Sequence, residues 1–352
     1  MQLVRIQPNK ERLGKLTRLL QQTSVDRLLL SEISNIFYLI GVWPMGRTIL
    51  SISKSGDLSV FGSKLDFFLS ESDEVDVFAG RGEAEIFEEL RRRIMTAQDA
   101  YVETDDVLPL ESRSGLESRA LVKSGNNVVQ RIRSIKDEEE IRLMRKSGEL
   151  AKEGMRAALE GTKVGVSEKD IAMSAECAML EKGADEFAFR TSVGSGWRAS
   201  LPHALPTEKK IANGELVVID LGADVEHYKS DITRTAMVGS TDAQSRKVFD
   251  SVKDTYDACA EAVSPGIRID ELGQKADRML SSAGFSEGIL HGLGHGVGLD
   301  IHEEPSVSSK NPEKLISGNV ITVEPGIYIR GVTGARWENT LLVTGTGHEI
   351  LT

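Results

Sequence analysis

The sequence predicts an α+β protein with two domains, a smaller α/β domain followed by a larger α+β domain. Its 352 residues exceed the usual size of a single hydrophobic core. Helical and strand patterns alternate in the first third of the chain, whereas long amphipathic helices and then short β-rich runs follow. Hydrophobic residues make up 40% of the chain and charged residues 28%, a balance typical of ordered globular proteins.

The first domain, expected at residues 1–127, begins with a helix in which four leucines repeat at helical spacing within residues 8–23. Two further helices are predicted at 31–41 and 83–95. Short apolar, β-branched runs predict strands at 25–30, 47–54, 58–62, 74–79 and 99–103.

The second domain, expected at residues 128–352, opens with a long amphipathic helix whose start is marked by Ser134 and a cluster of acidic residues. A second helix has Ser167 as its expected N-cap and ends at Gly183. A helical pair is predicted between 243 and 283. Strands are predicted at 215–223, 227–239, 319–329 and 335–345.

Charge and hydropathy exclude several classes of partner. The formal net charge of −11 argues against nucleic-acid binding. No run approaches the ~20 apolar residues that cross a bilayer, and the N-terminus has no apolar signal core, so a cytoplasmic protein without membrane contact is expected. Cys177 and Cys259 lie in apolar helical patterns and are interpreted as reduced core residues.

The run LHGLGHGVGLDIHEEP, residues 290–305, concentrates histidines and glycines. His291 and His295 are four residues apart, but each alternate glycine would cost a helix ~1 kcal/mol. The run is therefore expected to be extended, with both histidines on one face and room at the glycines for a substrate. His302 joins them only if the chain bends, and the alternative is that these histidines are satisfied within a turn.

Four carboxylates are attached to otherwise apolar strand patterns: Asp220, Asp231, Glu324 and Glu338. Singly, each has a simpler explanation, such as solvent contact at a strand end or pairing of Asp231 with Arg234 at the surface. If the four gather with His295, their repulsion requires compensation, and two divalent cations would balance it. Carboxylates with one imidazole suit manganese, cobalt, iron or zinc. Such a pair, ~3.5–4 Å apart, activates a shared water and polarises a carbonyl.

These motifs resemble the pita-bread-fold metallopeptidases, which include prolidase, aminopeptidase P and methionine aminopeptidase. The resemblance rests on two aspartates separated by ten residues, then GHGVGLDIHEEP, VEPGIY and RWENT in that order. The segments RIRSIKDEEEIRLMRKSGELA and NIFYLIGV are similar to the creatinase/prolidase group. The resemblance thus implies a pita-bread catalytic domain after a creatinase/prolidase-type α/β domain, and a homodimer.

The resemblance also implies a role for each site residue. Asp220 would bind one metal ion, Asp231 and Glu338 would bridge two, and His295 and Glu324 would complete the set. Manganese or cobalt is expected, with zinc or iron as alternatives. Glu324 would also carry a proton to the leaving nitrogen. The substrate-side residues would be His203, His291 and His302, with Arg336 pairing with acidic groups around the site.

The activity implied is hydrolysis of Xaa-Pro dipeptides, small peptides with proline second, by a metal-bridging hydroxide. The alternatives are an aminopeptidase P acting on longer peptides and a non-catalytic relative that binds peptide or protein. Trp43 lies in a loop that in relatives reaches toward a neighbouring active site. Trp337 departs from the family's aliphatic residue and could reshape the pocket. Tyr328 could lie near the site but is interpreted as a core aromatic, and His227 is interpreted as a turn residue.

Overall fold

The computed structural model describes residues 6–67, 72–96, 101–104, 121–124 and 128–352. The chain divides into two compact units, Met1–Arg133 and Ser134–Thr352. The division falls later than the expected boundary at residue 127, which itself lies outside the described residues. It does so because helix α6 (Val128–Arg133) belongs to the first unit: the buried Arg133 donates from Nη1 to Asn35 Oδ1 at 2.7 Å.

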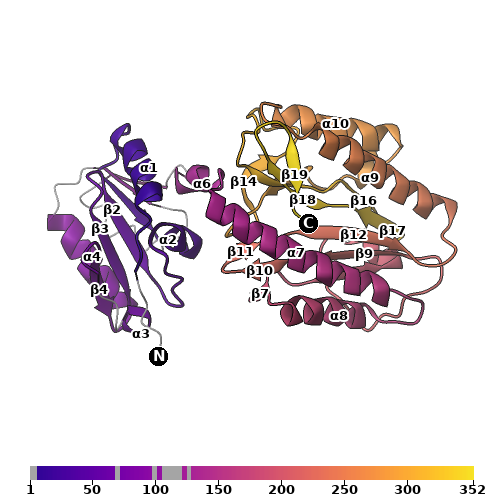
Figure 1. Ribbon diagram of the computed structural model, residues 1–352, viewed down its shortest axis with the longest axis horizontal. Coiled ribbons are helices and arrows are strands. Elements are labelled where there is room, and N and C mark those ends of the chain that lie inside the picture. Colours follow the sequence, from indigo (N-terminus) through magenta and orange to yellow (C-terminus); the bar gives the residue numbers. More distant parts are fainter. Residues whose placement is uncertain (1–5, 68–71, 97–100, 105–120, 125–127) are drawn as a thin grey trace. The chain divides into compact units, whose positions relative to one another are not determined.

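The first unit is a mixed sheet with helices packed on it (Figure 1). The strand order is β4 (Asp76–Gly80), β3 (Leu58–Ser63), β2 (Ile49–Ser53), β1 (Arg27–Leu30), β5 (Tyr101–Thr104) and β6 (Leu121–Ser124). The helices are α1 (Lys10–Gln21), α2 (Ile33–Ile40), α3 (Lys64–Phe67) and α4 (Glu83–Thr96). Helix α4 buries Ile86 and Leu90 against Leu29, Ile49 and Phe61. Helix α6 completes the helices that the described residues of this unit form. Five of the strands and three of the helices were predicted, whereas β6, α3 and a separate α6 were not.

The long helix of the second unit, α7 (Glu138–Gly161), begins later than predicted. Its N-cap is Asp137, whose side chain accepts from the backbone N–H groups of Glu139 and Glu140, while the Glu140 side chain accepts from the Asp137 N–H. This reciprocal capping satisfies donors that the helix itself cannot use. Ser134 was therefore the wrong start. The next helix, α8 (Glu168–Glu181), is capped by Ser167 as predicted.

Two sheets of the second unit carry most of the candidate site residues. One has the order β12 (Ile232–Met237), β9 (Leu216–Leu221) and β8 (Ser192–Ser195). The other has the order β14 (Glu303–Val307), β13 (Gly294–Gly296), β15 (Val320–Val323), β18 (Asn339–Val343) and β19 (His348–Ile350). Smaller elements are the hairpin β16 (Gly326–Ile329) and β17 (Thr333–Arg336), and the sheet β11 (Tyr228–Lys229), β10 (Ala223–Val225) and β7 (Glu186–Phe187).

Helix pairs cover the sheets of the second unit on opposite sides. Figure 1 shows α7 and α8 on one side, and α9 (Ala243–Ala262) and α10 (Ile269–Ser282) on the other. Cys259 of α9 is buried, as predicted, in the apolar core between α9, α10 and the five-stranded sheet. Cys177, by contrast, is exposed, because it lies on α8 away from the buried Ile171 and Ala175.

Two further observations bear on the sequence predictions. Among the described residues, no helix combines the length and hydropathy needed to cross a membrane. The Trp43 ring packs edge-on against Phe37 with ring centroids 5.6 Å apart, within the first unit. Its role as a lid stays a prediction. His227 lies in the turn between β10 and β11 with a positive φ of 71°.

Candidate metal centre

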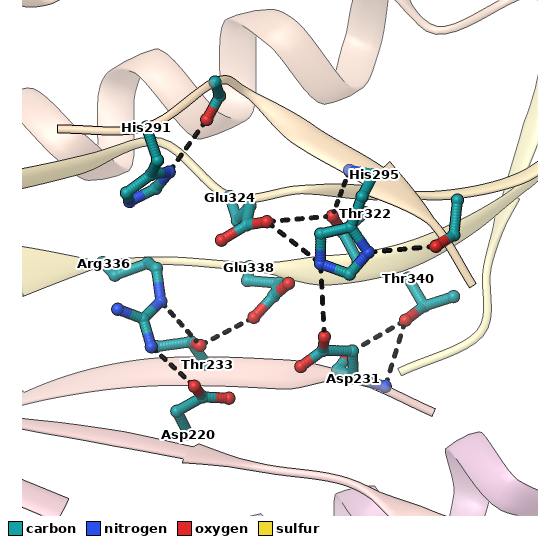
Figure 2. A network of polar contacts seen from close by, with 12 residues as sticks. Asp220, Asp231, Thr233, His291, His295, Thr322, Glu324, Arg336, Glu338 and Thr340 are labelled. Carbon is teal, nitrogen blue, oxygen red and sulfur yellow. Dashed lines mark hydrogen bonds and ion pairs between the residues drawn. The ribbon is translucent and has the colours of Figure 1, made fainter. Parts of the chain in front are cut away.

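The two sheets bring the five predicted ligands together (Figure 2). These are Asp220 on β9, Asp231 just before β12, His295 on β13, Glu324 just after β15, and Glu338 between β17 and β18. Ligand atoms of Asp231, His295 and Glu338 all lie within 4.8 Å of one another, a grouping that can hold a metal ion. Glu324 joins them, since its Oε1 lies 3.2 Å from His295 Nε2.

Strand register explains how the acidic residues converge. Asp220 on β9 is directly opposite Thr233 on β12, so both side chains are on one face of the sheet. The Glu338 N–H donates to the Thr233 carbonyl at 3.1 Å, which joins the second sheet to the first at this point. The Thr233 hydroxyl then donates to Glu338 Oε2 at 2.6 Å.

His295 is oriented by its own strand. Its Nδ1 faces the Gly296 carbonyl at 3.0 Å, so this nitrogen carries a hydrogen. The other nitrogen, Nε2, points at Glu324 Oε1 and lies 3.6 Å from Asp231 Oδ2. A backbone carbonyl that fixes one imidazole nitrogen as a donor leaves the other available as a ligand. The backbone N–H of His295 donates to the Thr322 hydroxyl at 3.0 Å.

When no cation is bound, the clustered carboxylates strongly shift one another's pKa values. Burial, followed by the charges of Glu324 and Asp220, raises the pKa of Glu338 to about 8. Burial and then the charge of Glu338 raise the pKa of Asp231 well above its usual value. Burial would also raise the pKa of Glu324, but the hydrogen bond and charge of His295 lower it to about 2. Burial opposes protonation of His295, but the hydrogen bond and charge of Glu324 raise its pKa to about 9. Only the neutral imidazole is a metal ligand, so a bound cation would take the place of this proton.

Two buried carboxylate oxygens show that the cluster fits divalent cations. Asp220 Oδ1 and Glu338 Oε1 are buried and have no hydrogen-bond partner in the described part of the chain. An unpaired buried carboxylate oxygen is costly, whereas a metal ion satisfies it directly. Oxygen ligands with a single imidazole are also the donor set of hard or borderline divalent cations.

Arg336 links the acidic cluster to the neighbouring side chains. It is 3% exposed, and its Nη2 donates to Asp220 Oδ2 at 2.7 Å. Its Nε donates to the Thr233 hydroxyl at 3.1 Å and its Nη1 to the Tyr328 hydroxyl at 2.7 Å. The sequence prediction that Arg336 pairs with an acidic group is therefore met by Asp220.

The Tyr328 contact determines the tautomer of His291. A guanidinium can only donate, so the Tyr328 oxygen accepts from Arg336 and has its own hydrogen for His291 Nε2, 2.8 Å away. Burial, opposed by the charge of Arg336, raises the pKa of Tyr328 to about 12, which keeps this hydrogen at neutral pH. His291 Nδ1 then donates to the Gly292 carbonyl at 2.8 Å.

The other two cleft histidines approach the centre differently. The chain bends after β13, so the His302 ring lies edge-on to the His295 ring with centroids 4.4 Å apart. Burial, and then the charge of His295, lower the pKa of His302. His203 is exposed and lies just after the short helix Gly196–Ser200, and its part in the site stays a prediction.

The alternate glycines of residues 290–305 serve a different purpose from the predicted one. A Cβ on Gly294 would lie 2.2 Å from the Thr322 carbonyl oxygen, and one on Gly296 would lie 2.3 Å from the Glu304 carbonyl oxygen. The backbone of the adjacent segments of the same chain therefore occupies the space that the sequence analysis assigned to a substrate. The glycines allow β13 to pack closely between β14 and β15.

Two other interpretations are corrected by the structure, those of Tyr328 and Arg234, whereas the effect of Trp337 on the pocket stays a prediction. Tyr328 is not simply a core aromatic, since its hydroxyl joins Arg336 to His291. Trp337, between β17 and β18, packs edge-on against Phe249 of α9 with centroids 6.0 Å apart, whereas its neighbours Arg336 and Glu338 contact the Thr233 hydroxyl. Arg234 does not pair with Asp231 but stacks over the Trp337 ring at 4.7 Å.

Sequence reasoning assigned no role to Tyr328 and missed the threonine hydroxyls that hold the ligands. Thr233 bonds Glu338, and Thr322 bonds Glu324 at 3.2 Å. Thr340 clamps the backbone of Asp231, donating to its carbonyl at 2.9 Å and accepting from its N–H at 3.2 Å. The available signal was spacing, since Thr233 and Thr322 each lie two residues from a predicted ligand and so share its face of the strand.

A buried carboxylate cluster with an oriented imidazole defines a metal-dependent protein, and comparison with known proteins identifies which class. Residues 142–345 match the family described as "Metallopeptidase family M24". The chain belongs to this family of metallopeptidases, with an N-terminal α/β domain before the catalytic domain.

Relatives match along nearly the whole chain. It is 34% identical over 344 residues to the Xaa-Pro dipeptidase of Pyrococcus furiosus, covering 97% of this chain and 98% of that one. It is similar to the crystal structure of the prolidase from Pyrococcus horikoshii, with a TM-score of 0.89 and 33% identity over 97% of this chain and 98% of that chain. It also matches an X-Pro aminopeptidase from Thermotoga maritima, with a TM-score of 0.83 and 26% identity over 97% of both chains.

Proposed function

We propose that this metallopeptidase hydrolyses Xaa-Pro dipeptides. The observation that carries the proposal is the cluster of four carboxylates and one imidazole, in which Asp220 Oδ1 and Glu338 Oε1 are buried and have no hydrogen-bond partner within the described ranges of the chain. The full-length similarity to the Xaa-Pro dipeptidase of Pyrococcus furiosus supports the substrate class. A homodimer and a cytoplasmic location, both expected at the level of the sequence, are part of the same proposal.

We assign the ligand roles as the sequence suggested. Asp220 would bind one divalent cation, Asp231 and Glu338 would each bind two, and His295 and Glu324 would complete the second set. When bound, a cation pair supplies a water of lowered pKa and polarises a carbonyl. Manganese or cobalt is the proposed metal, since oxygen-rich ligation suits both.

Glu324 is the proposed general base and acid. Its carboxylate is held by the Thr322 hydroxyl and by His295, so it has a fixed direction toward the centre of the cluster. It takes the proton of the attacking water and then delivers it to the leaving prolyl nitrogen. An amide nitrogen must be protonated before it can leave. Because this nitrogen belongs to a tertiary amide with no N–H, peptidases that bind the N–H of the scissile amide fail.

The three cleft histidines divide the work of holding the substrate. Both ring nitrogens of His291 already contact protein groups, Tyr328 and the Gly292 carbonyl. His302 and His203 are therefore the proposed donors to the substrate carbonyl and carboxylate. His291 is held in place by Tyr328, which is itself held by Arg336. A hydrogen-bond donor near the carbonyl stabilises the oxyanion more strongly in the tetrahedral state than in the ground state.

Release of the first residue from longer peptides is the second candidate. The similarity to the X-Pro aminopeptidase from Thermotoga maritima favours it. The two activities share the chemistry at the scissile bond and differ in the space beyond the proline, so a substrate series separates them.

The experiment strips the protein with chelator and reloads it in parallel with Mn²⁺, Co²⁺, Zn²⁺ and Fe²⁺. Cleavage is then measured for Ala-Pro, Ala-Pro-Ala and Ala-Pro-Ala-Ala, with Ala-Ala as the non-proline control. We expect fast cleavage of Ala-Pro with Mn²⁺ or Co²⁺. Equal or better cleavage of the longer peptides would support the aminopeptidase instead. Less than one equivalent of bound metal together with no cleavage would reject both.

A further inference from the structure

A buried ion pair lies beside the candidate ligands without belonging to them. Lys136 Nζ is 3.0 Å from Glu303 Oε2, and both side chains are only 1% exposed. Lys136 precedes α7, and Glu303 is the first residue of β14 and follows His302 directly. Buried ion pairs are seldom needed for stability, because apolar residues of similar volume often serve as well. This pair therefore calls for another role.

The Glu303 carboxylate organises the segment 298–303. Its Oε1 accepts the Asp300 N–H at 2.9 Å, and its Oε2 accepts from Lys136. The segment also packs tightly on the carboxylate, since a Cβ on Gly298 would lie 2.6 Å from Oε2. The Gly298 N–H donates to the Asp300 carbonyl at 3.1 Å and so closes the turn. The segment is thus folded around Glu303.

Lys136 is itself fixed relative to β15, the strand that ends just before Glu324. Its N–H donates to the Gly318 carbonyl at 2.8 Å, and Ile135 forms a β-bridge with Asn319. Asn319 directly precedes β15, the strand that ends just before Glu324. The ion pair consequently ties the turn that carries His302 to the start of the strand that delivers Glu324.

We infer that Lys136 and Glu303 are positioning residues that hold His302 against His295. This inference rests on the proposed function, because it assigns His302 to substrate contact. The His302 ring has its edge contact with His295 at a centroid distance of 4.4 Å, so a shift of the turn moves it relative to the cluster. Errors of about 1 Å in a reacting geometry lower rates by up to about 100-fold.

The test replaces the pair without leaving a buried charge, using Lys136→Met together with Glu303→Met in the full chain. We expect a folded protein with unchanged affinity for Mn²⁺ and a kcat/KM on Ala-Pro lowered about 10- to 100-fold. If that variant does not fold, Lys136→Gln with Glu303→Gln provides a neutral hydrogen-bonded pair for the same measurements. Wild-type kcat/KM in the folded variant overturns the inference.

Coupling to His302 distinguishes positioning from a general structural effect. In a His302→Ala background, removal of the ion pair should have no further effect on kcat/KM, because the histidine through which it acts is already absent. The matched control is Arg145→Met with Glu349→Met, which removes the ion pair between α7 and β19 and should show no coupling to His302. Additive losses for the Lys136–Glu303 variant contradict the inference.

Hydrogen exchange gives a readout that does not depend on activity. The Asp300 N–H should exchange faster in the Lys136→Met/Glu303→Met variant, since its acceptor is lost. Unchanged exchange across residues 298–303 overturns the positioning role. A wild-type protein that cleaves no Xaa-Pro peptide rejects the proposed function instead, while the exchange experiment still decides whether the pair anchors the turn.

Discussion

Arg336 donates from Nη2 to Asp220 Oδ2 at 2.7 Å and leaves Asp220 Oδ1 buried, with no hydrogen-bond partner among the residues that the structure describes. The guanidinium thereby fixes the direction of the aspartate and neutralises one of its oxygens, while the other remains for a cation. Arg336 also donates to the hydroxyl groups of Thr233 and Tyr328. One side chain therefore orients both the Asp220 carboxylate and the tyrosine that contacts His291.

Replacing Arg336 by methionine should weaken cation binding. The outer partner of a ligand typically contributes about 10- to 100-fold in metal affinity, and we expect a loss in that range. Affinity is measured by competition of Mn²⁺ with a chelating dye. Arg336→Lys keeps the charge but not the forked geometry, so its affinity for Mn²⁺ should lie between those of the wild type and Arg336→Met. Equal affinities in all three would show that Asp220 needs no orientation.

Glu324→Gln should reduce turnover of Ala-Pro by at least about 100-fold, because the amide neither accepts nor returns the proton. Steady-state kcat with saturating Mn²⁺ measures this. Glu313→Gln, a change at an exposed carboxylate of the same domain, is the control and should leave kcat unchanged. Near-normal turnover in Glu324→Gln would refute its role in proton transfer.

Chelation of the protein should lower its melting temperature, since the clustered carboxylates then repel without compensation. At a cation concentration of 100 times Kd, binding stabilises the folded state by about 2.7 kcal/mol. For a domain of this size we expect a shift of roughly 5–10 °C by differential scanning fluorimetry. Asp231→Asn removes one of the two proposed bridging ligands and should abolish most of the response to Mn²⁺.

Gly294→Ala should destabilise the protein strongly. The added Cβ would lie 2.2 Å from the Thr322 carbonyl oxygen, and backbone must move to admit it. Overpacking of this kind costs about 1–3 kcal/mol or more, measured by urea unfolding. At Gly345 a Cβ meets nothing within 4 Å, so Gly345→Ala is the matched control with an expected change near zero.

The two cysteines should differ in reactivity. Burial, opposed by the charge of Lys275, raises the pKa of Cys259 to about 11. Since the folded value exceeds the usual one of 9.0, the protonated thiol contributes stability below pH 9, and this contribution is lost as the pH rises through about 11. At pH 8 a disulfide reagent should label the exposed Cys177 rapidly and Cys259 only after denaturation. Fast labelling of both in the native protein would contradict the buried position.

Much of the second unit could be predicted from its sequence. Apolar strand patterns interrupted by Asp220, Asp231, Glu324 and Glu338 indicated both the strands and the unusual placement of charge. Ser167 marked the start of α8 because a cap depends only on residues within one turn. The start of α7 was less certain, since Ser134 and Asp137 both have capping side chains and only the contact with Glu140 decided between them.

The sequence by itself determined which residue types carry the chemistry, because strand periodicity, glycine and acidic side chains are local properties. Only the tertiary structure decided what the alternate glycines accommodate, that Trp337 faces α9, and that Tyr328 joins Arg336 to His291. Thr233 and Glu338 are 105 residues apart in sequence and 2.6 Å apart at their oxygens. Such contacts depend on how two sheets pack, and no local pattern encodes that distance.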